Sequence, residues 1–236
     1  MFHIYVNNIV TNIFPRTSFG VAQTPISCLY DAKAHLQRRV IPTRATVGVM
    51  APRYEYRVWA QDLAELHARL KKQCEPLSVR VSAEIYLVFG ADVNVKIRSE
   101  ILDVKEILRT EQGFQLWTPT LKEAFPLAAA TVRDVLRLAG PNPPTFRVEY
   151  LEMADFLALA KEAGAVVTAV SKRRSGYSHE GCLLEFAEVN VEGSGLHTVA
   201  VESEDLDTAI EVVAQMGIDG LPNRSYPVAL RQALGM

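Results

Sequence analysis

Several short segments of this chain alternate apolar side chains with charged ones, and this alternation limits what the chain can fold into. In residues 93–98, two valines and an isoleucine share one side, while Lys96 and Arg98 share the other. Successive side chains of a β-strand point to opposite faces of a sheet, so a period of two predicts strands with one packed face and one charged face. The pattern recurs at Lys105 in residues 101–109 and at Lys172 and Arg174 in residues 166–174.

The remaining periodicities predict an alternation of strands and helices. We expect strands at residues 53–59, 78–89, 93–98, 101–109, 114–117, 146–151, 166–174, 182–191 and 196–203. We expect helices at residues 62–73, 127–138, 154–163 and 206–216. The second half repeats the first weakly, because residues 146–151 again carry Arg and Glu on one face before a helix and basic strands. This repeat predicts an α+β fold, an antiparallel β-barrel or tunnel built from two pseudo-repeated halves with flanking helices.

The composition excludes some classes of protein and leaves the function open. A formal net charge of −2 over 236 residues argues against specific nucleic-acid binding, which needs a basic surface. No apolar run has the length of a membrane helix, so we expect no membrane association. Three cysteines, Cys28, Cys74 and Cys182, fit neither a disulfide framework nor a zinc site, and we expect a cytoplasmic protein.

Two regions differ in character. Residues 1–49 contain one acidic residue, Asp31, and no sustained periodicity. We expect them to be an N-terminal extension, either a disordered tail or sequence upstream of a true start at Met50, with a transit peptide as a further alternative. Residues 50–236 are expected to form the tunnel domain.

The cations suggest a phosphate-rich partner. Like charges on neighbouring strands repel each other, so such a face needs a compensating anion or interleaved carboxylates. Arg offers a fork of donors to phosphate oxygens and Lys a point charge. We therefore expect a phosphorylated small molecule, such as a triphosphate, nucleotide or polyphosphate, as the partner. The substrate-binding candidates are Arg57, Lys96, Arg98, Lys105, Arg147, Lys172 and Arg174.

Acidic residues lie on the same predicted faces, among them Glu55, Glu149 and Glu202. Carboxylates of this kind hold Mg²⁺ or Mn²⁺ together with substrate phosphates. The alternative is that they only neutralise the neighbouring arginines in a structural network.

The order of the charged motifs resembles a known family. Glu55 is preceded by Arg53 and followed by Arg57 on the first strand, basic pairs follow on later strands, and Glu188 (or Glu185) and Glu202 flank a glycine-containing turn. A Ser-Tyr sequence then ends at Tyr226. This arrangement, over residues 53–226, resembles the CYTH superfamily, or triphosphate tunnel metalloenzymes, which includes class IV adenylyl cyclases, thiamine triphosphatases and inorganic triphosphatases.

The resemblance implies a site for catalysis and metal binding. It assigns Glu55, Glu188 and Glu202 to Mg²⁺ or Mn²⁺ and to the attacking water, while the cations hold the phosphates. The chain departs from the family pattern at Arg53 and Ala200, where a carboxylate is expected. The leading hypothesis is a metal-dependent triphosphatase. The alternatives are a non-catalytic nucleotide- or polyphosphate-binding module, a class IV-type adenylyl cyclase, and a protein-association domain whose charges are structural.

Overall fold

The computed structural model of the protein describes residues 51–139 and 143–236. The predicted extension at residues 1–49 lies outside the described residues. Within those two described segments, no helix combines the length and the apolar character that crossing a membrane requires.

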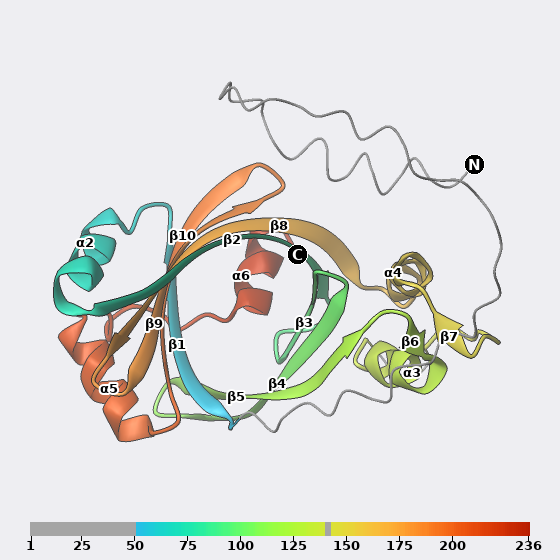
Figure 1. Ribbon diagram of the computed structural model, residues 1–236, viewed down its shortest axis with the longest axis horizontal. Helices are drawn as coiled ribbons and strands as arrows, with labels where there is room; N and C mark the ends of the chain where they lie inside the picture. Colours follow the sequence, from blue (N-terminus) through green and yellow to red (C-terminus); the bar gives the residue numbers. More distant parts are fainter. Residues whose placement is uncertain (1–50, 140–142) are drawn as a thin grey trace, which may run out of the picture. The chain divides into compact units, whose positions relative to one another are not determined.

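Eight strands form a closed antiparallel barrel (Figure 1), in the order β1-β10-β9-β8-β2-β3-β4-β5. The barrel strands are β1 (Arg53–Ala60), β2 (Glu75–Val88), β3 (Val93–Arg98), β4 (Ile101–Glu111), β5 (Phe114–Ala124), β8 (Val166–His179), β9 (Cys182–Val191) and β10 (Ser194–Ser203). The barrel confirms the predicted fold class and is the architecture that the resemblance to tunnel enzymes implies. A short two-stranded sheet outside it pairs β6 (Leu127–Ala128) with β7 (Tyr150–Leu151).

Tight turns set the register of the hairpins. The β8–β9 turn has positive φ at both Glu180 and Gly181, and the β9–β10 turn at both Glu192 and Gly193. Two successive residues with positive φ match the twist of antiparallel strands, and glycine adopts this conformation without strain. The register then runs without interruption from Leu196 to Glu202 along the β9–β10 ladder.

The seam between β1 and β5 is short and is completed by a loop. β5 pairs only with Arg53 to Glu55 of β1. Further along, the β1 edge is bonded by the segment before the last helix, with Arg57 N donating to Asn223 Oδ1 at 2.8 Å and Arg224 N donating to the Arg57 carbonyl at 2.8 Å. The loop therefore supplies hydrogen-bond partners to backbone groups of β1 that β5 does not reach.

Helices cover the barrel on two sides (Figure 1). The helices are α2 (Ala64–Gln73), α3 (Ala129–Arg137), α4 (Met153–Glu162), α5 (Leu206–Gln215) and α6 (Tyr226–Ala233). α2 and α5 pack their apolar faces on the outer faces of β1, β9 and β10, in a core that contains Leu70, Phe186 and Val212. α3 and α4 pack on β3 and β4, in a core that contains Leu136 and Phe156. These four helices therefore lie outside the barrel, and other residues fill its interior.

α6 fills part of the barrel interior. Tyr226 and Leu230 from this helix pack among inward-facing residues of β2, β8 and β9, including Val170 and Val189. Figure 1 shows α6 within the ring of strands. Burial of each such side chain contributes about 1.5–3 kcal/mol. This apolar plug confines the remaining polar interior to the other part of the barrel.

The structure differs from the expected elements at several points; β5, for example, extends to Ala124 and β8 to His179. The predicted strand at residues 146–151 is reduced to Tyr150–Leu151, which pairs with β6 and not with the barrel. The predicted helix at residues 127–138 begins at Ala129, because Leu127 and Ala128 pair with β7. α6 was not predicted. The barrel consequently takes five strands from the first half and three from the second.

Candidate anion-binding tunnel

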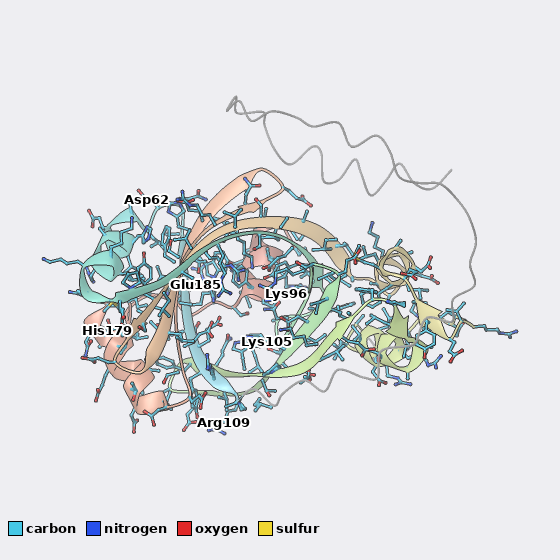
Figure 2. All side chains as sticks on the ribbon, in the orientation of Figure 1. Asp62, Lys96, Lys105, Arg109, His179 and Glu185 are labelled. Carbon is cyan, nitrogen blue, oxygen red and sulfur yellow. The ribbon has the colours of Figure 1, made fainter. Side chains whose placement is uncertain are left out.

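The inner faces of the barrel strands bring charged side chains from seven strands together. Because successive residues alternate between the two faces, Glu55 and Arg57 both point inward from β1, as do Lys172 and Arg174 from β8. Figure 2 shows Lys96, Lys105 and Glu185 within the ring of strands, whereas Arg109 and His179 lie at its periphery. The interior is therefore a charged tunnel and not a purely apolar core.

One buried acid is surrounded by three cations. The Glu84 carboxylate of β2, fully buried, lies 3.0 Å from Lys172 Nζ, 3.5 Å from Arg98 and 3.6 Å from Arg174. We call these four residues the Glu84 cluster. Burial alone would raise the pKa of Glu84, but Lys172, Lys96 and Arg174 outweigh it and hold the pKa at about 2.

One buried cation is surrounded by three acids. Arg57, whose side chain is 4% exposed, lies 2.8 Å from Glu55, 3.3 Å from Glu185 and 3.8 Å from Glu202. We call these four residues the Arg57 cluster. The Tyr226 ring lies 4.7 Å from the guanidinium carbon and covers it. Arg174 connects the two clusters, since it lies 3.9 Å from Glu185.

The carboxylates of the Arg57 cluster differ in proton affinity. Burial is the main influence on Glu202, and the adjacent Glu55 adds to it, so the pKa of Glu202 rises to about 7. Burial acts on Glu55 in the same direction, but Arg57 and Lys105 together outweigh it and the pKa of Glu55 is lowered. The pKa of Glu202 therefore lies above that of Glu55, and Glu202 is the carboxylate of this pair that takes up a proton first.

The lysines of the tunnel are short of compensating negative charge. Burial lowers the pKa of Lys172 to about 7, because repulsion from Lys96 offsets part of the attraction of Glu84. Burial also lowers the pKa of Lys96, against the attraction of Glu84 and Asp103. The attraction of the nearby carboxylates is thus smaller than the free-energy cost of burying these two cations.

The two clusters border a cavity of about 120 Å³. Its lining residues are Glu55, Arg57, Tyr86, Asn94, Lys96, Lys105, Trp117, Lys172, Arg174, Glu185, Glu202 and Tyr226. The volume is roughly four times the ~30 Å³ that one water occupies in the liquid, which gives room for a phosphate-sized group. Lys105 lines this cavity and, among the described residues, forms no ion pair.

A second hollow adjoins the cavity and opens to solvent. It measures about 310 Å³ and shares Arg174, Glu185 and Glu202 with the cavity. Arg80 adds a further cation there, and Leu183 lines its rim. We call this hollow the mouth. The cavity and the mouth together form a path with cations along its length.

Three residues that line this cavity each have a buried polar atom with no hydrogen-bond partner in the described part of the chain. The three atoms are Asn94 Oδ1, Arg174 Nε and Tyr226 Oη. Buried polar groups in proteins are almost always hydrogen-bonded, so such atoms require an explanation. A ligand or ordered water in the cavity would supply the missing partners.

The structure brings together most of the residues proposed from sequence. Seven of them line the cavity, namely Glu55, Arg57, Lys96, Lys105, Lys172, Arg174 and Glu202. Arg98 joins through the Glu84 cluster. Arg57, proposed as a substrate ligand, has its donors directed at three carboxylates of its own chain.

Two proposed residues lie elsewhere. Glu188 is exposed on the outer face of β9, because it differs in parity from Glu185, and Glu185 takes the inward position. Arg147 is exposed and precedes β7, since the expected strand does not form there. Neither residue contributes to the tunnel.

Sequence reasoning missed Glu84, the acid at the centre of the Glu84 cluster. Glu84 lies between Ser82 and Tyr86 on the inward face of β2, and that alternation was its available signal. A single acid among predominantly basic faces did not draw notice.

The carboxylates present do not fit the Mg²⁺ or Mn²⁺ site that the resemblance implies. Glu55, Glu185 and Glu202 converge on the guanidinium of Arg57, which already occupies the point where a shared metal would lie. Within the described residues, no three or more Asp, Glu, His or Cys side chains are arranged to hold a metal ion. A cation at that point repels a divalent ion directly. We therefore derive no metal-assisted step.

The fold and the site together define a closed antiparallel barrel with a cationic tunnel. Searches with this chain find no matching family model and no matching curated protein.

Several solved structures are similar to this chain. A conserved hypothetical protein from Pyrococcus furiosus is 17% identical, with a TM-score of 0.48, over 74% of this chain and 98% of that chain. The PH1012 protein of Pyrococcus horikoshii is 14% identical, with a TM-score of 0.47, over 77% of this chain and 99% of that chain. HpAC1 from Hippeastrum, a putative adenylyl cyclase described with a dominant triphosphatase activity, is 14% identical, with a TM-score of 0.46, over 78% and 96% of the two chains.

Proposed function

We propose that this protein binds a triphosphate or a related polyphosphate anion in its barrel. The observation that carries the proposal is the convergence of three lysines and an arginine (Lys96, Lys105, Lys172 and Arg174) on one cavity. The Nε atom of this arginine is buried and has no hydrogen-bond partner among the described residues. An anion there would accept from this nitrogen, from the lysines and from the Tyr226 hydroxyl. Its negative charge would also offset the free-energy cost of burying the cations. Without the anion, that burial lowers the pKa of Lys172 and Lys96.

The path of cations favours a linear polyphosphate over a single phosphate. One phosphoryl group fits the cavity of about 120 Å³. Further groups would extend past Arg174 into the mouth, where Arg80 lies. Charge-assisted hydrogen bonds to ionised groups contribute about 1.5–3 kcal/mol each, so several along one chain would give specificity for length.

Lys105 offers the cleanest test of binding. Its removal leaves no ion-pair partner unsatisfied among the described residues, whereas removal of Lys172 would leave the buried Glu84 short of a cation. We expect Lys105→Met to weaken the binding of sodium tripolyphosphate about tenfold, which corresponds to the ~1.4 kcal/mol of one lost charged contact. Isothermal titration calorimetry in EDTA and low salt measures the dissociation constant.

The matched control is Arg173→Met, since Arg173 lies on β8 between Lys172 and Arg174 but is exposed on the opposite face. We expect its affinity to equal that of the wild type. Unchanged affinity in Lys105→Met, or no tripolyphosphate binding by the wild type, would remove the tunnel from consideration as an anion site.

Hydrolysis of the bound anion with Mg²⁺ or Mn²⁺ stays a prediction from sequence, as does cyclisation of a nucleotide. Incubation of the purified protein with inorganic triphosphate, thiamine triphosphate and ATP, each with Mn²⁺ and with EDTA, separates the possibilities. Release of phosphate or a cyclic product identifies an enzyme. Binding without any product identifies a binding module.

A further inference from the structure

We infer that the Arg57 guanidinium is a built-in cation that takes the place of a divalent metal in this tunnel, so that the site binds its anion without a metal ion. The inference deepens the proposed function and concerns the same site. It begins with a conflict between two acids. Glu55 of β1 and Glu202 of β10 lie directly opposite each other in the ladder. Like charges in that arrangement destabilise a sheet unless a cation lies between them.

Arg57 supplies that cation and also reaches a third acid. Arg57 is paired with Ala200, and Ala200 is paired in turn with Glu185. Strands lie about 4.8 Å apart, so the backbones of Arg57 and Glu185 are separated by roughly 10 Å. The guanidinium spans this distance and ends 3.3 Å from Glu185.

Ala200 makes this span possible. Its side chain is one methyl group, fully buried beneath the arginine, and leaves free the space through which the Arg57 side chain passes. A glutamate at this position would fill the space and add a fourth carboxylate. Ala200 and Arg57 therefore belong together: the absence of a carboxylate at position 200 leaves room for the positive charge of Arg57.

Arg57 is held from several directions. Its side chain is almost fully buried, the Tyr226 ring covers it, and its backbone is bonded to Asn223 and Arg224. A side chain held in this way cannot move aside for a metal without leaving a charge buried and unpaired. Arg57 thus already compensates the charge of Glu55, Glu185 and Glu202. The lysines of the tunnel remain available to bind the anion.

Titration with Mn²⁺ alone tests the inference apart from anion binding. Arg57→Met keeps most of the side-chain length and removes the charge, which leaves Glu55, Glu185 and Glu202 facing one point. We expect the full-length wild type and the Arg173→Met control to show no stoichiometric Mn²⁺ binding at millimolar metal. We expect Arg57→Met to bind one Mn²⁺ at least about tenfold more tightly than the wild type. Electron paramagnetic resonance of free Mn²⁺ gives the stoichiometry, and Glu55→Gln in the Arg57→Met background should abolish the gained site.

A wild type that binds one Mn²⁺, lost in Glu55→Gln, would overturn the inference. So would an Arg57→Met protein that melts cooperatively and binds no Mn²⁺. If Arg57→Met does not fold, the wild-type titration decides by itself, because the absence of binding supports a resident guanidinium and one bound Mn²⁺ contradicts it. Tripolyphosphate is absent throughout, so a failure here leaves the proposed function standing, and a failure of tripolyphosphate binding leaves this result standing.

Discussion

The carboxylate of Glu84 makes the stability of the barrel depend on pH in the acid range. Its pKa is about 2 in the folded protein against an ordinary value of 4.5, because three cations surround it. A carboxyl group with a lowered folded pKa stabilises the fold above its unfolded pKa, and this stabilisation is lost as the pH falls towards the folded value. The loss should therefore occur between about pH 4.5 and pH 2.

We expect Glu84→Gln to remove this acid-dependent part of the stability. At neutral pH the variant should have a free energy of unfolding lower by about 3–5 kcal/mol, because the buried Lys172 loses its ion-pair partner. Its stability should then change less than that of the wild type between about pH 4.5 and pH 2, where Glu84 titrates. Urea denaturation at both pH values measures this.

Glu188→Gln is the control for this change, since Glu188 is exposed on the outer face of β9. It should shift the free energy of unfolding by no more than about 0.5 kcal/mol. An equal response to acid in the wild type and in Glu84→Gln would mean that Glu84 is not the group responsible.

Individual residues show where sequence reasoning succeeds and where it fails. The period of two placed Lys96, Lys105 and Lys172 on inward faces, and the barrel brings them to one cavity. The sequence did not decide between Glu188 and Glu185, because the family motif can be aligned with either residue. A shift of one residue in a strand reverses the face, and the distance from Glu188 to Glu185 is an odd number of residues.

At the scale of an element, α6 was the main omission. Residues 226–233 form a helix of only two turns, and its apolar residues are too few for a persistent helical period. A proline in the first turn was the available signal, because proline is favoured at that position. The helix owes its stability to the barrel interior into which it packs, and that environment is not visible in a local window of sequence.

We expect Leu230→Ala to destabilise the protein by about 2–4 kcal/mol, because Leu230 is fully buried among inward-facing side chains and the cavity left behind cannot close. Urea denaturation measures the change. Gln232→Ala, at an exposed position of the same helix, should leave stability within about 0.5 kcal/mol of the wild type. If the two variants were equally stable, α6 would not be part of the folded barrel.

For the molecule as a whole, local periodicity predicted most barrel strands, and the bounds of β3 and β9 match the expected residues 93–98 and 182–191. It could not show that β7 leaves the barrel. Arg147 and Glu149 alternate as a strand would, but a strand also needs a partner edge. Both edges of β1 are already bonded, one by β10 and the other by β5 and the loop containing Asn223.

We predict that the barrel folds without the N-terminal extension. The eight barrel strands and the residues of both charged clusters lie after Met50. A protein beginning at Met50 should therefore melt within about 2 °C of the full-length chain, a shift that corresponds to less than 1 kcal/mol at this size, and bind tripolyphosphate with the same affinity. Circular dichroism on heating and calorimetry compare the two. A markedly lower melting temperature would make the extension part of the domain.

The pairing of β1 with β10 bears on how the chain is made. Tyr54 faces Ser203 across that seam, so the first barrel strand to leave the ribosome must wait for the last one. Contacts between residues so distant in sequence form slowly. During this delay the sheet is open, and water reaches the lysine, arginine and glutamate side chains of its inner face together with the valines that later pack on α6. Exposed apolar surface promotes aggregation, and we expect the interleaved charges to reduce association between nascent chains until synthesis has passed Ser203.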